Sequence, residues 1–264
     1  MTDQSERIVC LVQARMGSSR LPEKVMKEIC GQPMLSWVID RARRSTLITT
    51  FAVATTTSSD DQDIADWCST HHVACYRGAE YDVLDRFYRA ASWLQADIVV
   101  RLTGDCPFMD ASLIDQAIVR LQQNKLDFVA NRLPPPFHRS FPIGLDVEVV
   151  RFPALQQAWQ QADQPFEREH VMPYIYEEPG RFVIEVLHAD QDQGAQRWTV
   201  DTPQDLDFIQ AVAQEFGCRN DFSWKEVLCV LDAKPELMRI NAAVQHKSFR
   251  DVDNRSAAEK DQTQ

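Results

Sequence analysis

The sequence has no apolar run long enough to cross a lipid bilayer, and its first residues, MTDQSER, are polar rather than the apolar core of a signal peptide. We therefore expect no membrane insertion and a cytoplasmic location. The chain also lacks CxxC pairs and Cys/His clusters, which excludes the common structural zinc motifs. Its seven cysteines are scattered along 264 residues, a pattern typical of a reducing cytoplasm, and a chain of this length needs no disulfide to fold.

Positive charge is scarce in this sequence. Lys and Arg number 28 against 39 Asp and Glu, which gives a formal net charge of −11. The phosphates of a long nucleic acid would repel such a chain, and so would an anionic membrane surface. An anionic substrate can therefore bind only where basic side chains are concentrated locally.

One loop concentrates them. The segment QARMGSSRLPEK (13–24) carries neither the Walker A pattern nor the GxGxxG fingerprint, but it holds three cations, Arg15, Arg20 and Lys24. Gly17 and Ser18 are small enough for backbone N–H groups to approach an anion closely. The loop follows an apolar run, and ligands of doubly wound folds bind beyond the carboxyl ends of such strands. We predict a phosphate-binding loop; the alternative is a basic surface loop.

Short apolar runs alternate with amphipathic segments, which predicts an α/β fold with a mostly parallel sheet covered by helices on both faces. A single domain over residues 1–246 explains the pattern, with a small, partly antiparallel flap inserted at about 131–180. The polar segment 247–264 is expected to be disordered. Expected strands are 8–12, 51–54, 73–76, 97–102, 126–130, 144–150, 182–187 and 198–201; expected helices are 34–42, 59–68, 83–91, 113–121, 153–161, 167–176, 202–216 and 223–231.

Several motifs resemble those of the cytidylyltransferases that make CMP-activated acidic sugars, above all the branch named for the spore coat polysaccharide biosynthesis protein F. They are IVCLVQARMGSSRLPEKVMKEICGQPML, YRGAEYDVLDRFYRAA, VVRLTGDCPFMD, GLDVEVV, EREHVMPYIY and RWTVDTPQDL. The resemblance implies a nucleotide-diphospho-sugar-transferase-like three-layer α/β/α sandwich with a small dimerisation flap. It also implies transfer of CMP from CTP to an acidic sugar, with release of pyrophosphate, Mg²⁺ as the cofactor and a homodimer as the assembly.

The resemblance further implies roles for individual residues. The catalytic residues expected from it are Arg15 and Lys24, which match phosphate-contacting positions, and Asp105, which matches a metal-binding carboxylate. Asp201 matches a second metal carboxylate, and Gln13 and Ala14 match positions near the nucleotide. From the residues alone, Asp105 could also be a turn residue before Pro107, and Asp201 could be the N-cap of the helix that follows it.

Other polar residues are expected at the same edge of the sheet. Thr55 and Arg77 follow predicted strands and are candidates for the base and ribose, as is Thr103, which stands where related keto-deoxy acid synthetases carry a glutamine that helps to read cytosine. Arg139, Arg168 and His170 are candidates for the carboxylate of the sugar. All of these residues could instead be ordinary polar residues of loops or a surface helix.

Two other functions compete with cytidylyl transfer. A glycosyltransferase of the same fold usually carries a DxD metal motif at the end of a central strand, but the chain reads Gly104-Asp105-Cys106-Pro107 there. A non-catalytic nucleotide-binding protein would be expected to lose the cations of the loop, and all three are present.

Overall fold

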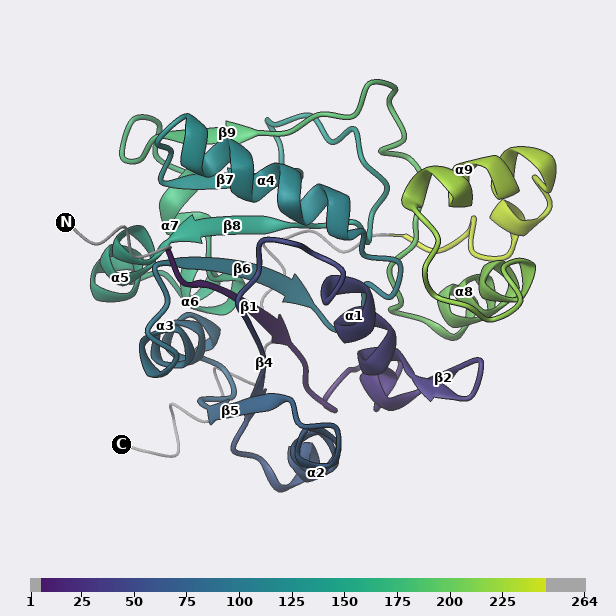
Figure 1. Ribbon diagram of the computed structural model, residues 1–264, viewed down its shortest axis with the longest axis horizontal. Coiled ribbons are helices and arrows are strands. Elements are labelled where there is room, and N and C mark those ends of the chain that lie inside the picture. The colour runs from purple at the N-terminus through teal and green to yellow at the C-terminus, as the bar shows by residue number, and fades with distance from the viewer. Residues whose placement is uncertain (1–5, 246–264) are drawn as a thin grey trace.

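The computed structural model describes residues 6–245, so the segment 247–264 lies outside the described residues. Its centre is a seven-stranded sheet in the order β5-β4-β1-β6-β8-β7-β9 (Figure 1). The strands are β1 (Ile8–Gln13), β4 (Thr50–Thr56), β5 (Ala74–Gly78), β6 (Ile98–Thr103), β7 (Phe128–Ala130), β8 (Glu148–Arg151) and β9 (Ile184–Val186). All neighbours in this sheet are parallel except those of β8, which is antiparallel to β6 and β7.

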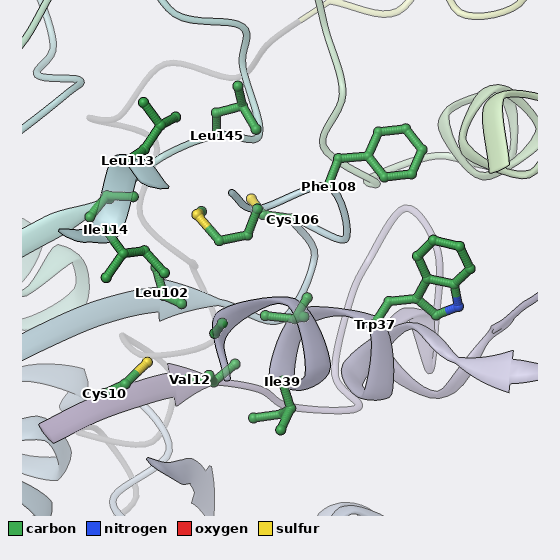
Figure 2. Packing of buried hydrophobic residues seen from close by; sticks show 14 of the residues in the cluster. Cys10, Val12, Trp37, Ile39, Leu102, Cys106, Phe108, Leu113, Ile114 and Leu145 are labelled. Atoms are coloured by element: carbon green, nitrogen blue, oxygen red, sulfur yellow. The ribbon is translucent and has the colours of Figure 1, made fainter. Parts of the chain in front are cut away.

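Helices cover both faces of the sheet and produce two hydrophobic cores. Side chains from α1, α2, α4, α8 and α9 pack on one face, and Figure 2 shows members of this core from α1 (Trp37 and Ile39), β1 (Val12) and β6 (Leu102). Side chains from α3, α5 and α7 pack on the other. The bounds are α1 (Met34–Ala42), α2 (Gln62–Thr70), α3 (Val83–Trp93), α4 (Ala111–Gln123), α5 (Phe152–Gln161), α6 (Pro165–His170), α7 (Pro173–Tyr176), α8 (Pro203–Glu215) and α9 (Trp224–Ala233). The three-layer α/β/α sandwich is confirmed.

Local sequence explains why these elements begin where they do. The first five residues of β1 are apolar and buried, as expected for a strand covered on both faces. The helices α3, α4, α8 and α9 start after Asp82, Asp110, Thr202 and Ser223, whose side chains accept hydrogen bonds from the first-turn amides.

Two predicted elements are wrong. Residues 198–201 form no regular strand; the preceding residue, Arg197, makes an isolated bridge with Ile143. The helix predicted at 167–176 is two short helices, α6 and α7, because Val171 adopts a positive φ of 73° and Pro173 starts a new helix.

Antiparallel pairing occurs in two places. A separate two-stranded antiparallel sheet joins β2 (Glu28–Ile29) to β3 (Gln32–Pro33), directly after the cationic loop. The segment 131–180, for which a partly antiparallel flap was predicted, supplies the antiparallel strand β8 to the main sheet, followed by α5, α6 and α7. Glu148 of β8 is buried with Val149 and Val150, so both faces of this strand are covered.

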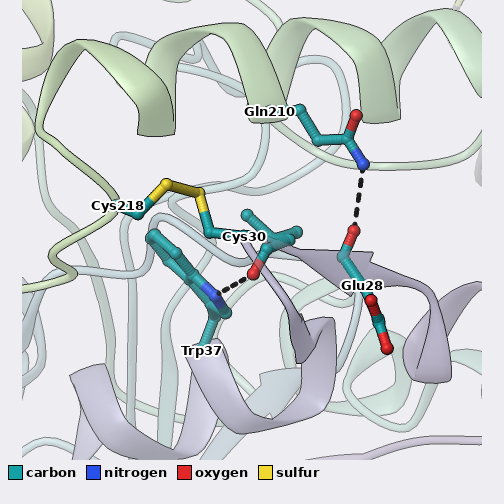
Figure 3. The surroundings of a disulfide bond; sticks show 6 residues. Glu28, Cys30, Trp37, Gln210 and Cys218 are labelled. Atoms are coloured by element: carbon teal, nitrogen blue, oxygen red, sulfur yellow. Dashed lines mark hydrogen bonds between the residues drawn. A yellow bond between two sulfur atoms is a disulfide. The ribbon is translucent and has the colours of Figure 1, made fainter.

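A disulfide between Cys30 and Cys218 corrects the expectation of unbonded cysteines. Figure 3 shows this bond between the β2–β3 hairpin and the segment after α8. The indole of Trp37 donates to the carbonyl oxygen of Ile29 over 2.9 Å, and Gln210 of α8 donates to the carbonyl oxygen of Glu28 over 3.0 Å. The hairpin is therefore fastened to the segment after α8 by the disulfide, to α8 by the hydrogen bond of Gln210 and to α1 by that of Trp37. Within residues 6–245, no helix is both long and apolar enough to span a membrane.

Candidate active site

The buried carboxylate of Asp61 anchors the cationic loop. Asp61 accepts a hydrogen bond from the backbone N–H of Met16 over 2.7 Å and bonds to the hydroxyls of Thr55 and Thr56. Thr55, a predicted nucleotide-binding residue, is fully buried, and its hydroxyl is 3.1 Å from Asp61. Thr55 therefore contacts the carboxylate that anchors the cationic loop.

The ammonium group of Lys24 connects two aspartates from distant parts of the chain. Its Nζ lies 2.6 Å from Oδ2 of Asp105 and 2.8 Å from Oδ1 of Asp201, and it also donates to the carbonyl oxygen of Val200 over 3.0 Å. Lys24 begins a short 3-10 helix (Lys24–Met26), Asp105 follows β6, and Asp201 precedes α8. The structure thus brings together three of the residues for which the sequence predicted catalysis or metal binding.

Close backbone contacts bring these three segments together. The amide of Gly104 donates to the carbonyl oxygen of Gln13 over 2.8 Å, and the amide of Val200 donates to that of Asp105 over 2.9 Å. A Cβ atom on Gly104 would lie 3.1 Å from the oxygen of Gln13, which is tighter than ordinary contact. Glycine before Asp105 therefore lets the ends of β1 and β6 approach each other.

Asp201 is bound by several cations and is not the helix cap. Thr202 is the N-cap residue of α8 and forms a capping box with Asp205, so the cap alternative for Asp201 is wrong. Its Oδ2 lies 2.9 Å from Arg20 and 2.7 Å from Arg197. Burial acts to raise the pKa of Asp201, but Lys24, Arg197 and Arg20 outweigh it and hold the pKa well below its usual range.

Electrostatics also fix the charge of Lys24. Burial acts to lower the pKa of its ammonium group, but the adjacent Asp105 and Asp201 raise it above the ordinary value. A positive charge at this point is therefore stable between the two carboxylates.

Asp105 and Asp201 place two carboxylates at one point. Mg²⁺ prefers oxygen ligands and commonly binds one or two carboxylates, with substrate phosphates as further ligands. The described residues include no group of three or more His, Cys, Asp or Glu side chains arranged for a metal ion. Asp105 and Asp201 are accordingly the protein groups that could hold it.

The other predicted nucleotide-binding residues lie in the cationic loop and near the ends of β1, β5 and β6. Arg15 lies 3.9 Å from Glu80, and Gln13 accepts a hydrogen bond from Arg101. Arg77 donates to the carbonyl oxygens of Thr56 and Ser58 and to Gln62, so its guanidinium holds the segment after β4. The remaining four are Ala14, whose amide donates to Ala54; Gly17 and Ser18, within the loop; and Thr103, whose hydroxyl lies 3.1 Å from Sγ of Cys106.

Of the three predicted acceptor-binding residues, Arg168 and His170 both belong to α6, and Arg139 lies apart from them. Arg139 donates to both oxygens of Asp146, at 2.8 and 3.2 Å, in the segment that enters β8. Arg168 forms an ion pair with Asp82, the N-cap of α3, at 2.6 Å. His170 is in the last turn of α6. The structure does not gather them into one group.

Sequence reasoning missed Arg86, Arg101, Asp61 and Arg197. Arg101 interrupts the apolar strand β6, and Arg86 falls between Leu84 and Phe87 on the buried stripe of α3. The signal for Arg86 and Arg101 was a charge at a position where the periodicity predicts burial.

Comparison with known proteins identifies the family. A family model described as Cytidylyltransferase matches residues 9–227. The spore coat polysaccharide biosynthesis protein SpsF of Bacillus subtilis is 30% identical over 236 residues, which cover 87% of this chain and 95% of that protein. A 3-deoxy-manno-octulosonate cytidylyltransferase of Trichlorobacter lovleyi is 35% identical over 116 residues, 42% of this chain and 44% of that one.

A solved structure extends the similarity to three dimensions. The cytidylyltransferase from Leptospira borgpetersenii serovar Hardjo-bovis superposes with a TM-score of 0.84 at 28% identity, covering 91% of this chain and 100% of that chain. The matched region includes the cationic loop and both aspartates. The chain therefore belongs to the cytidylyltransferase family and is a nucleotidyltransferase enzyme.

Proposed function

We propose that the protein transfers CMP from CTP to an acidic sugar with release of pyrophosphate and with Mg²⁺ as its cofactor. The observation that carries the proposal is the contact of Lys24 with both Asp105 and Asp201 beside the cationic loop. Cations for phosphate oxygens and carboxylates for a hard metal ion meet there, at the carboxyl ends of parallel strands.

In this reaction a hydroxyl oxygen of the sugar bonds to the α-phosphorus of CTP, and the bond from that phosphorus to the bridging oxygen of pyrophosphate breaks. The hydroxyl proton passes to water. Arg15, Arg20 and Lys24 bind the phosphates, hold the α-phosphorus in position and balance the charge that builds on the leaving pyrophosphate. Asp105 and Asp201 would hold Mg²⁺, which supplies Lewis-acid polarisation of the phosphates.

The relatives support an acidic sugar as the acceptor. SpsF is named for polysaccharide biosynthesis, and the Trichlorobacter protein is named for 3-deoxy-manno-octulosonate, a sugar acid. We also propose a homodimer, which light scattering at micromolar concentration would show as a doubled mass.

A glycosyltransferase of the same fold remains the second candidate in chemical terms. It would release no pyrophosphate, because it receives a sugar that is already activated. The segment after β6 has a single aspartate, Asp105, where such enzymes usually carry two, and this favours nucleotidyl transfer.

The test is a pyrophosphate-release assay with four nucleoside triphosphates against a panel of acidic sugars that includes 3-deoxy-manno-octulosonate. We expect release with CTP, loss of most turnover in Asp105→Asn, and loss of activity in excess chelator. Asp221→Asn is the control, because Asp221 forms an exposed ion pair with Arg219 away from the site. Full activity in Asp105→Asn, or no release with any sugar, would refute the proposal.

A further inference from the structure

Three arginines gather near the carboxyl edge of the sheet, on the face that α3 covers. Arg101 comes from β6, Arg86 from α3 and Arg15 from the loop after β1. Burial lowers the pKa of Arg86 to about 10, and repulsion from Arg15 and Arg101 contributes to this shift. Contacts place the three groups together as well. Glu80 lies 3.9 Å from Arg15 through its carboxylate and accepts from Arg86 over 3.3 Å through its carbonyl oxygen, and Arg101 lies over the ring of Phe87, the neighbour of Arg86 on α3.

Arg86 is fully buried beneath the segment that joins β5 to α3. Its Nη1 donates to the carbonyl oxygens of Ala79, at 2.5 Å, and Glu80, at 3.3 Å. Gly78 passes directly over it, since a Cβ there would lie 3.1 Å from Cγ of Arg86. Its Nε and Nη2 are buried and have no hydrogen-bond partner within residues 6–245.

Arg101 extends the group toward the nucleotide loop. Its Nη2 donates to Oε1 of Gln13 over 2.9 Å, and its Nη1 bonds to Glu148 of β8. Its Nε is buried and, within the part of the chain that the structure describes, has no acceptor. Gln13 is the last residue of β1, so Arg101 lies at the entrance to the cationic loop.

The three arginines differ in their acidic partners. Glu148 pairs with Arg101, and Glu80 lies 3.9 Å from Arg15, whereas no carboxylate of residues 6–245 forms an ion pair with Arg86. A buried cation whose donors lack acceptors is unfavourable, and a planar guanidinium binds a carboxylate through two parallel hydrogen bonds.

The geometry also separates Arg86 and Arg101 from Lys24, whereas Arg15 of the cationic loop lies beside both. Lys24 is bonded to the carbonyl oxygen of Val200, and Val200 packs in the core on the opposite face of the sheet. Phe87, whose ring centroid lies 5.6 Å from the guanidinium carbon of Arg101, belongs to the core under α3. An anion bound by Arg86 and Arg101 would therefore be a different group from the phosphates held near Lys24.

We propose that Arg86 and Arg101 form the subsite that holds the carboxylate of the acceptor, with Nε and Nη2 of Arg86 and Nε of Arg101 as donors. This inference rests on the proposed function, because it identifies the part of the site that distinguishes an acid from a neutral sugar. It assigns acceptor specificity to two residues outside the cationic loop.

The test is calorimetry on the whole protein with saturating CMP, using 3-deoxy-manno-octulosonate and its neutral methyl ester as probes. Wild type is expected to bind the acid about 10- to 100-fold more tightly than the ester, the range for hydrogen bonds to a charged group. In Arg101→Gln and Arg86→Gln this ratio falls to near one, while the affinity for CTP changes by less than about twofold. Arg151→Gln is the matched control, since Arg151 lies at the far end of β8 and bonds to Glu6.

A wild-type ratio in the variants would overturn the subsite, and so would equal binding of acid and ester by wild type. An unchanged ratio with a large loss of CTP affinity would overturn it too, because the group would then hold phosphate. If Arg86→Gln does not fold, as a melting curve would show, the ratio in Arg101→Gln decides the question. Pyrophosphate release is measured separately, so a protein that binds the acid selectively without transferring CMP refutes only the proposed function.

Discussion

Replacing Lys24 by methionine tests whether its ammonium group occupies the position that a metal ion would take. Methionine keeps the unbranched length of the side chain but removes the charge, which leaves Asp105 and Asp201 without the cation between them. The side chain of Lys24 is 13% exposed, so solvent screens this contact only weakly.

The size of the effect follows from these contacts. Removing one partner of a buried ion pair costs about 3–5 kcal/mol, and the lower end applies because Asp201 keeps Arg20 and Arg197. A domain of this size loses about 2–4 °C of melting temperature per kcal/mol, so Lys24→Met should melt about 6–12 °C below wild type. Mg²⁺ at 100 times its dissociation constant would return about 2.7 kcal/mol to the variant. Wild type should gain less, because there the metal ion must displace the ammonium group.

Thermal unfolding across a Mg²⁺ titration, with and without chelator, measures both effects. Lys234→Met is the control, because Lys234 pairs with Glu215 on the surface, where an ion pair contributes less than about 1 kcal/mol. The reasoning fails if Lys24→Met melts within about 2 °C of wild type, or if Mg²⁺ stabilises both proteins equally.

Two further predictions concern stability. The folded pKa of Asp201 is depressed, so its contribution is fully present above the unfolded pKa of about 3.9 and is lost as the pH falls further. The difference in melting temperature between wild type and Asp201→Asn should therefore be constant from pH 5 to 8 and shrink below about pH 4; a constant difference down to pH 2 would contradict this. Cys218→Ser opens a loop of 188 residues closed by Cys30 and should cost about 2–5 kcal/mol, seen as a lower urea midpoint than that of oxidised wild type, with no difference once both are reduced.

Elements with a strong local pattern could be predicted from the sequence. The strand at 8–12 and the helix at 34–42 match β1 and α1 closely. A continuous apolar run predicts the first, and apolar residues at helical spacing predict the second. Residues 198–201 also look like a strand, but whether an apolar segment joins a sheet depends on partners that are distant in the sequence.

Some features of the candidate site could likewise be predicted from the sequence, and others could not. The loop cations and Asp105 could be predicted because they stand next to a recognisable strand. The position of Lys24 between two aspartates could not, since it depends on three segments meeting in space. The bond between Cys30 and Cys218 spans a separation of 188 residues, and no spacing rule connects such a pair.

The direction of β8 has a consequence for how changes in the segment before it would reach the site. Because β8 is antiparallel, Glu148 at its beginning pairs with Arg101 near the end of β6, so the chain enters β8 at the edge where the other strands end. The segment 131–147 therefore ends at the edge of the sheet from which the cationic loop leaves. Its Ile143 also exchanges backbone hydrogen bonds with Gln196 and Trp198, a few residues before Asp201. Insertions or deletions in 131–147 would therefore move Asp201 as well, and an exchange of this segment between family members should include residues 193–201.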